Sequence, residues 1–197
     1  MHIARTGRRW LAGCLLAGAV FGLWGLMPAA AGAESVKVPE DIYKWVQSSA
    51  RQDYFFNKQQ MRYGVTNGKV DKNILIVPTL RVYDDVQIRD IVTKRRWRHQ
   101  PLDGYNRLSC AAEYLRFDLR KHEVEVLEHD DLDDQWGTIS QSFNTEKDDY
   151  EQRAERDPER IFYKAILDYA AQHPEDMEQR AQWVISEAEK HGTDVPY

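Results

Sequence analysis

The fold is decided by residues 61–83, which read MRYGVTNGKVDKNILIVPTLRVY. Asn67-Gly68 divides this stretch, and the pair favours a tight hairpin turn because both residues adopt positive φ at little cost. The continuous apolar run that follows, residues 74–77, is typical of a strand buried on both faces. Pro78 has no N–H group to donate, so we expect the strand to be edge-like or bulged there.

Further short strands are predicted on both sides of this hairpin. The residues before it are rich in aromatic and β-branched side chains, and those after it alternate between apolar and polar positions. These segments are residues 42–46, 54–56, 108–119, 123–127 and 136–143, with the acidic residues 130–134 as the last turn. Consecutive short strands joined by tight turns favour an antiparallel meander.

Residues 85–98 are predicted to form a helix within this region, with a strand as the alternative. The start, Asp84-Asp85, is acidic, and the end, residues 94–98, is basic. This order of charges is favoured by the dipole of a helix.

Two more helices are predicted in residues 157–197. Asp157-Pro158-Glu159 is typical of a helix start, where a capping acid precedes a proline in the first turn. His173-Pro174 repeats this signal, and His191-Gly192 indicates the end of the second helix. Residues 144–156 are almost all charged or polar, and we interpret them as a linker.

These predictions together assign the chain to the α+β class. A small antiparallel β-meander in residues 34–143 is expected to pack against, or to be extended by, the C-terminal helical pair. The part of the chain that follows residue 33 has a length that suits one domain with its own core.

Residues 1–33 have the three parts of a secretory signal peptide. Arginines precede an uncharged apolar run, residues 11–27, and a stretch of small residues follows it. The pattern predicts cleavage between Ala33 and Glu34 and export to the periplasm, the cell surface or the medium. An uncleaved anchor is the alternative, because the apolar run is just long enough to span a bilayer.

Composition restricts the partners of the exported part. The first 33 residues contain three arginines and no acidic residue, so the remainder has a net charge of −8, against −5 for the whole chain. This balance disfavours nucleic acid and anionic membrane surfaces as partners. No second apolar stretch of spanning length follows, so no stable membrane span is expected after cleavage. Cys110 is the only cysteine after residue 33, and we expect it to be buried and unpaired.

Clustered charges and tryptophans are the candidate binding features. Guanidinium groups beside an aromatic ring suit a protein partner or an anionic ligand of the envelope or host. The candidate residues are Arg95, Arg96, Trp97, Arg98 and Trp136. The acidic residues 130–134 are interpreted as a solvated turn, with a cation site as the alternative. The sequence contains no zinc-ligand spacing, phosphate loop or nucleophile elbow, and no cofactor is predicted.

Several short motifs occur in an order that matches a known family. They are Trp45-Val46, Tyr54-Phe55-Phe56-Asn57, Tyr105-Asn106-Arg107-Leu108-Ser109, Phe117-Asp118-Leu119, and residues 123–127 and 161–169. In this order they resemble the surface-adhesin protein E-like domains of exported bacterial proteins, over about residues 42–170. The resemblance implies a small antiparallel sheet packed on a helix, a place in the cell envelope and a binding role without catalytic residues. The second C-terminal helix and the charged segment depart from that family.

The predicted function is therefore that of a non-enzymatic, exported envelope protein with a binding, adhesin-like role. A hydrolase with dispersed catalytic residues is one alternative, either a carboxylate hydrolase or a thiol hydrolase that uses Cys110 with a distant histidine. A structural or assembly factor that docks a partner through its C-terminal helices is the other.

Overall fold

The structure, a computed structural model, describes residues 36–143 and 147–195. In these residues, eight strands form one antiparallel sheet with the order β1-β2-β4-β5-β6-β7, while β3 also pairs with β4 and β8 with β6. The elements are β1 (Tyr43–Ser48), β2 (Gln52–Asn57), β3 (Arg62–Thr66), β4 (Lys69–Tyr83), α1 (Asp85–Trp97), a 3-10 turn η1 (Tyr105–Arg107), β5 (Leu108–Asp118), β6 (Glu123–Asp133), β7 (Thr138–Ser142), β8 (Lys147–Asp149), α2 (Pro158–Gln172) and α3 (Pro174–His191). The predicted α+β fold is confirmed. The predicted signal peptide, with Ala33 and Glu34, lies outside the described residues.

β4 lies in the interior of the sheet and is long enough to pair with two strands on one side. Its first half pairs with β3 and its second half with β2, while β5 runs along its other side. The β3–β4 hairpin turns at Asn67 and Gly68, whose φ angles of 53° and 71° confirm the predicted turn. Pro78 lies between the registers of β2 and β3, opposite Tyr114 of β5. β4 is an interior strand, but among the described residues Pro78 has no partner on the side of β2 and β3, so its position is edge-like locally, as expected.

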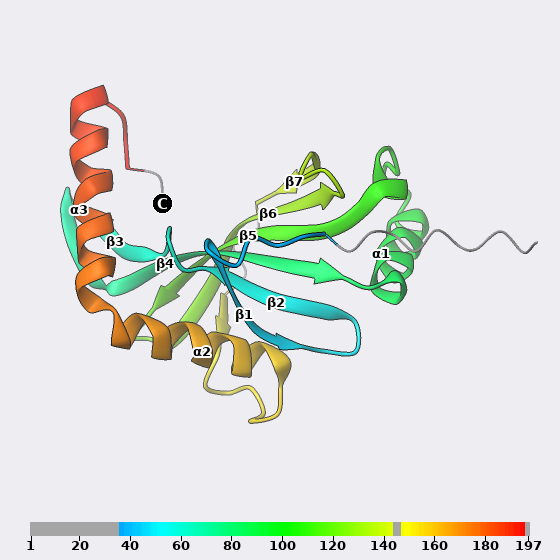
Figure 1. The fold of residues 1–197 in the computed structure, drawn as a ribbon, viewed down its shortest axis with the longest axis horizontal. Helices are drawn as coiled ribbons and strands as arrows, with labels where there is room; N and C mark the ends of the chain where they lie inside the picture. The colour runs from blue at the N-terminus through cyan, green and yellow to red at the C-terminus, as the bar shows by residue number, and fades with distance from the viewer. Residues whose placement is uncertain (1–35, 144–146, 196–197) are drawn as a thin grey trace, which may run out of the picture. The chain divides into compact units, whose positions relative to one another are not determined.

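α2 and α3 pack against the sheet at different places. Figure 1 shows α2 running along one face of the sheet and α3 standing at the end formed by β3 and β4. Phe162 of α2 lies against Tyr54, with ring centroids 5.2 Å apart, and Tyr163 lies against Phe117 at 5.6 Å. Met177 of α3 is fully buried in the same cluster. Both helices therefore contribute to the main core.

A smaller apolar cluster lies on the opposite face of the sheet. Leu80, Cys110 and Leu132 form it, and the N-terminal segment adds Val38 and Tyr43. Cys110 is fully buried, which confirms the expected burial of this thiol, and it forms no disulfide within the described residues.

The predicted linker, residues 144–156, is not a linker throughout. Lys147–Asp149 forms strand β8 and pairs with the start of β6. Tyr150 follows it and is buried, with its ring 6.0 Å from that of Phe117. The segment is mostly polar, and for this reason the sequence pattern did not indicate that Tyr150 packs into the core.

The acidic residues 130–134 are not a solvated turn either. β6 continues to Asp133, and the turn lies one step later, between Asp133 and the start of β7. Asp131 and Asp133 are both buried. Strand pairing continues through the acidic run because these carboxylates find partners inside the protein, as described below.

Candidate functional site

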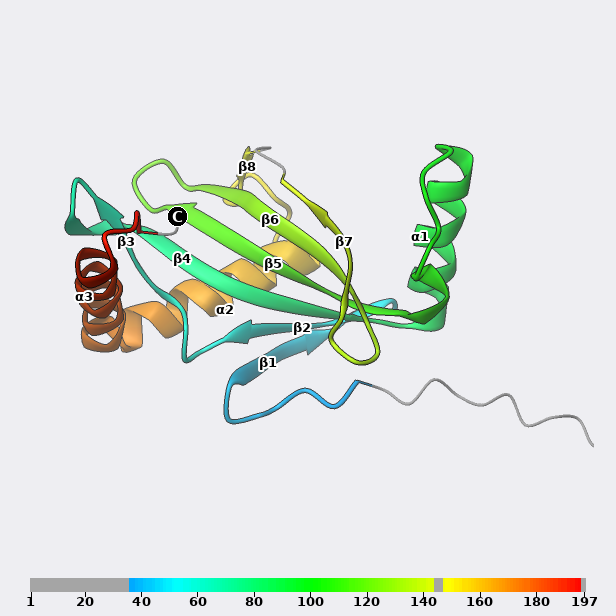
Figure 2. The same ribbon diagram turned by 90° about the horizontal axis from the view of Figure 1, so that it is seen from above.

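The predicted basic cluster lies on α1, a helix that its own domain covers only lightly. Within the described part of the chain, none of its residues is buried. Figure 2 shows α1 at the opposite end of the sheet from α3. The Asp84 carboxylate accepts a hydrogen bond from the Gln87 N–H at 2.7 Å and caps the first turn. An ion pair between Arg51 and Asp90 ties the helix to the β1–β2 turn. Polar contacts, more than a core, hold α1 in place.

The four predicted cluster residues have different environments. Trp97 is 81% exposed, which makes it the most exposed large hydrophobic side chain among the described residues. The Arg95 guanidinium lies over the Tyr105 ring, 4.0 Å from its centroid, and its Nε donates to the Pro101 carbonyl at 3.1 Å. Arg98 ends the helix as its C-cap.

Arg96 lines an open groove of about 550 Å³ between α1 and the returning loop. Ile88 and Val92 of α1 and Leu102 of the loop supply apolar surface, and Arg89 supplies a second guanidinium. Arg89 and Arg96 are seven residues apart, so they lie about 10 Å apart along the helix axis. The groove therefore combines an apolar stripe with two positive charges.

Trp136 lies apart from this groove, in the turn between β6 and β7. It is 40% exposed and has a positive φ of 66°. The Asp133 carboxylate holds the turn by accepting hydrogen bonds from the N–H groups of Gln135 and Gly137, at 3.0 and 2.7 Å. The predicted binding residues are thus divided between two places, with three on α1, Arg98 as its C-cap, and Trp136 in a separate turn.

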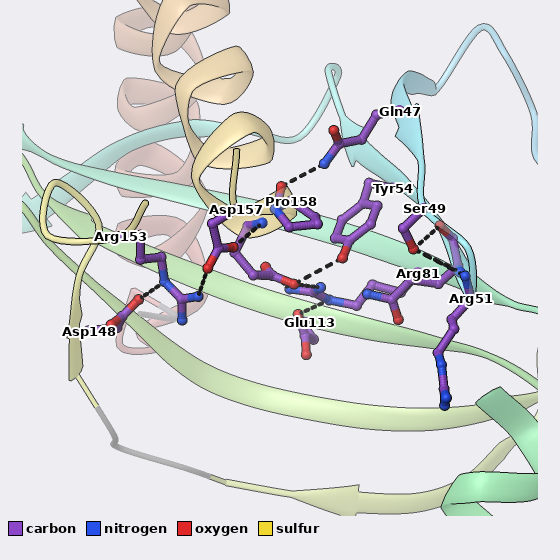
Figure 3. Close-up of polar contacts among 12 residues, drawn as sticks. Gln47, Ser49, Arg51, Tyr54, Arg81, Glu113, Asp148, Arg153, Asp157 and Pro158 are labelled. Atoms are coloured by element: carbon purple, nitrogen blue, oxygen red, sulfur yellow. Dashed lines mark hydrogen bonds and ion pairs between the residues drawn. The ribbon is translucent and has the colours of Figure 1, made fainter. Parts of the chain in front are cut away.

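A buried charge cluster at the start of α2 was not predicted from the sequence. Arg81 of β4 is its centre, and Figure 3 shows this side chain between Glu113 of β5 and the first turn of α2. Its Nε donates to Glu113 at 2.7 Å, and its Nη1 and Nη2 donate to the two oxygens of Glu159 at 2.5 and 2.9 Å. Tyr54 donates to Glu159 at 3.2 Å. These bonds join the sheet to α2.

The same cluster extends across the sheet to the groove. The Nδ1 atom of His129 lies 2.9 Å from Glu113, and its Nε2 atom lies 3.2 Å from Asp131. The Tyr105 hydroxyl donates to the other oxygen of Asp131 at 2.5 Å. Because Arg95 stacks on Tyr105, a continuous set of contacts connects the first turn of α2 with the last turn of α1.

Electrostatics in this cluster favour the charged forms of Glu113 and His129 and the neutral form of Tyr105. Burial opposes ionisation of Glu113, but Arg81 and His129 outweigh it and lower its pKa to about 2. Burial likewise opposes protonation of His129, but its bonds to Asp131 and Glu113 raise its pKa to about 9. Burial, reinforced by the bond to Asp131, raises the pKa of Tyr105 to about 12. Each charged group in the cluster therefore contacts a group of opposite charge at neutral pH. This arrangement suits a role in positioning α2 on the sheet.

One sequence signal could have revealed this cluster. Glu113 lies on the same face of β5 as Ala111, Leu115 and Phe117, all of which are buried. A charged residue on the apolar side of an alternating strand indicates a buried partner, because an unpaired buried charge is very costly. The identity of that partner, Arg81, depends on strand register and was not readable.

No group of three or more His, Cys, Asp or Glu side chains in the described residues is arranged to hold a metal ion. No helix among residues 36–143 and 147–195 has the length and apolar character needed to cross a membrane.

Comparisons with protein-family models, with curated proteins and with solved structures gave no match. The resemblance to the surface-adhesin protein E-like domains therefore stays a prediction, and the functional argument rests on the site itself.

Proposed function

We propose that this protein is a non-enzymatic binding module of the cell envelope that holds an acidic protein partner on α1. Trp97 carries the proposal. A tryptophan that is 81% exposed beside arginines has the composition of a binding hot spot, and the described residues leave most of its surface uncovered.

The charge of the groove supports an acidic partner. Arg89 and Arg96 line a surface on a chain whose net charge is −5. A local basic surface on an acidic protein steers partners of opposite charge and orients them. Ile88, Val92 and Leu102 would then supply the apolar contact from which most of the affinity comes.

Two observations argue against a thiol hydrolase and against a detachable C-terminal docking arm. Burial raises the pKa of Cys110 to about 12, so the side chain remains a thiol at neutral pH and is a poor nucleophile. α2 and α3 bury Phe162, Ile166 and Met177 in the main core, which is unlike a detachable docking arm.

Site-specific photo-crosslinking in the exporting cell tests the proposal. A photoreactive amino acid at position 97 is expected to capture a protein of acidic composition. The same group at position 45 serves as a matched control, because Trp45 is also exposed but lies on β1. Equal capture at both positions would show that α1 is not the binding surface.

Substitutions then test the contact energetically. Trp97→Ala and Arg96→Ala are each expected to weaken binding of the captured partner about tenfold, with an unchanged melting temperature. Trp45→Ala is expected to change neither quantity. Unfolding of the first two variants would instead make both residues structural.

Export is the second part of the proposal, and it rests on the signal pattern of residues 1–33. N-terminal sequencing of the protein from the envelope fraction is expected to begin at Glu34. An intact N-terminus, with the protein in the membrane fraction, would indicate an anchor instead.

A further inference from the structure

A second hollow, distinct from the α1 groove, lies between α3 and the sheet. It has a volume of about 270 Å³. β4 contributes Ile76 and Pro78 to it, and α3 contributes Trp183 and Val184. The hollow therefore has apolar surface on two sides, one of which includes an indole ring.

Two arginines also line this hollow. Arg180 of α3 donates from Nη1 to the Met61 carbonyl at 3.0 Å, and this bond fixes the guanidinium beside the start of β3. Its Nη2 lies 3.8 Å from Asp176, which is too far for a hydrogen bond. A guanidinium has five N–H donors, so Arg180 retains the capacity to bind an anion in the hollow.

Arg62 of β3 is the second guanidinium. It is only 6% exposed, and its Nη1 donates to the Tyr63 carbonyl at 3.1 Å. Burial lowers its pKa, because the guanidinium charge is less well solvated here than in water. An anion placed in the hollow would favour the charged form of Arg62.

We propose that this hollow binds a carboxylate carried by a single aromatic or short apolar group. Arg180 would hold the carboxylate through charge-assisted hydrogen bonds, with Arg62 as the second positive charge. Trp183, Ile76 and Pro78 would contact the apolar part. The volume lies just below the usual range for drug-sized ligands, so one ring or one amino-acid side chain fits. A free aromatic acid and the C-terminal residue of a peptide share this chemistry.

NMR of the indole N–H groups tests the proposal on the exported form of the protein. 3-Phenylpropionate is expected to shift the Trp183 resonance in a saturable way, and its neutral amide is expected to bind about tenfold more weakly. A short peptide that ends in phenylalanine, as free acid and as amide, separates the two sources. Tighter binding of the peptide acid would identify a chain terminus, and binding of the small acid alone would identify a free acid.

Variants connect the effect to the hollow. Arg180→Gln is expected to remove the preference for the acid over the amide, while Arg180→Lys retains part of it. Lys190→Gln, at the end of the same helix and outside the hollow, is the matched control. Equal binding of acid and amide to the unaltered protein, or a shift confined to Trp97, would overturn the proposal. So would the absence of any Trp183 shift.

Discussion

The Nε atom of Arg81 lies 2.7 Å from Oε2 of Glu113, and the two side chains are only 9% and 10% exposed. They come from neighbouring strands, and the same guanidinium holds Glu159 in the first turn of α2 (Figure 3). One arginine therefore fixes the position of a helix on the sheet. The arginine mainly orients the helix, because the free energy needed to take these charges out of water offsets much of their mutual attraction.

Loss of the Glu113 charge is the first test of this role. Glu113→Gln is expected to lower the free energy of unfolding by about 3 kcal/mol, since it removes a carboxylate that Arg81 and His129 share in the interior. Urea denaturation measures the change.

The matched control for that experiment is an exposed ion pair. Glu178→Gln breaks the bond between Glu178 and Lys72, whose side chains are well exposed. It is expected to cost less than about 1 kcal/mol. An equal loss of unfolding free energy in the two variants would mean that the buried cluster stabilises the fold no more than an exposed ion pair does.

The titration of His129 gives a second prediction, on the alkaline side. Its pKa is raised from 6.5 in the unfolded chain to about 9 in the folded protein, so its contribution to stability is complete below pH 6.5. That contribution is lost as the pH rises from 6.5 through 9, because the folded state then no longer binds the extra proton.

The expected loss is about 3 kcal/mol, and His129→Gln is expected to flatten the profile in this window. Urea denaturation at a series of pH values would detect it. Glu113 acts at the other end, because its lowered pKa gives stability that is lost only as the pH falls from 4.5 toward 2. A wild-type profile that is level between pH 6.5 and 9 would contradict the assigned bonds of His129.

Local signals in the sequence predict the structure correctly where a single turn or cap decides it. Asn67 and Gly68 form the predicted hairpin turn. Asp157 caps α2 by accepting a hydrogen bond from the Glu159 N–H at 2.8 Å, with Pro158 in the first turn. Each depends on residues within a few positions, so the sequence was sufficient.

Features that depend on distant partners were missed. The acidic end of β6 resembled a turn, but Tyr105 and His129 stabilise Asp131 in the strand, and Arg107 pairs with Asp133 at 2.8 Å. None of these pairings follows from local composition. The candidate site was predicted in part for the same reason: the α1 residues were found, whereas the buried cluster that supports Tyr105 was not.

The Cys110 thiol gives the third prediction. It is fully buried, and its pKa is raised to about 12 by burial and by the nearby Asp133 and Asp131 carboxylates. A thiol reagent at pH 8 is therefore expected to leave the folded protein unmodified and to react at once in urea. Ser109→Cys provides a control in the adjacent, less buried position. Rapid labelling of Cys110 without denaturant would restore the thiol-hydrolase hypothesis.

The last prediction concerns Gly64, which lies in β3 beside a bulge in the paired strand β4. The register changes between Tyr63, opposite Leu75, and Gly64, opposite Asp71, so Ile74 is displaced toward the glycine. A Cβ atom at position 64 would lie 2.5 Å from Cγ2 and 2.6 Å from Cβ of Ile74. Rotation of the isoleucine cannot relieve the second contact, because its Cβ is fixed by the backbone. Gly64→Ala is therefore expected to destabilise the protein by about 2 kcal/mol in thermal or urea unfolding.

A double-mutant cycle identifies the cause of that loss. Ile74→Ala retains the Cβ atom that lies 2.6 Å away, so it is not expected to rescue Gly64→Ala. Ile74→Gly removes the atom, so Gly64→Ala is expected to cost much less in that background than in the wild type. Rescue by Ile74→Ala would place the clash at Cγ2 alone. An equal cost of Gly64→Ala in all three backgrounds would show that the two positions do not touch, and that the glycine serves the backbone of the bulge instead.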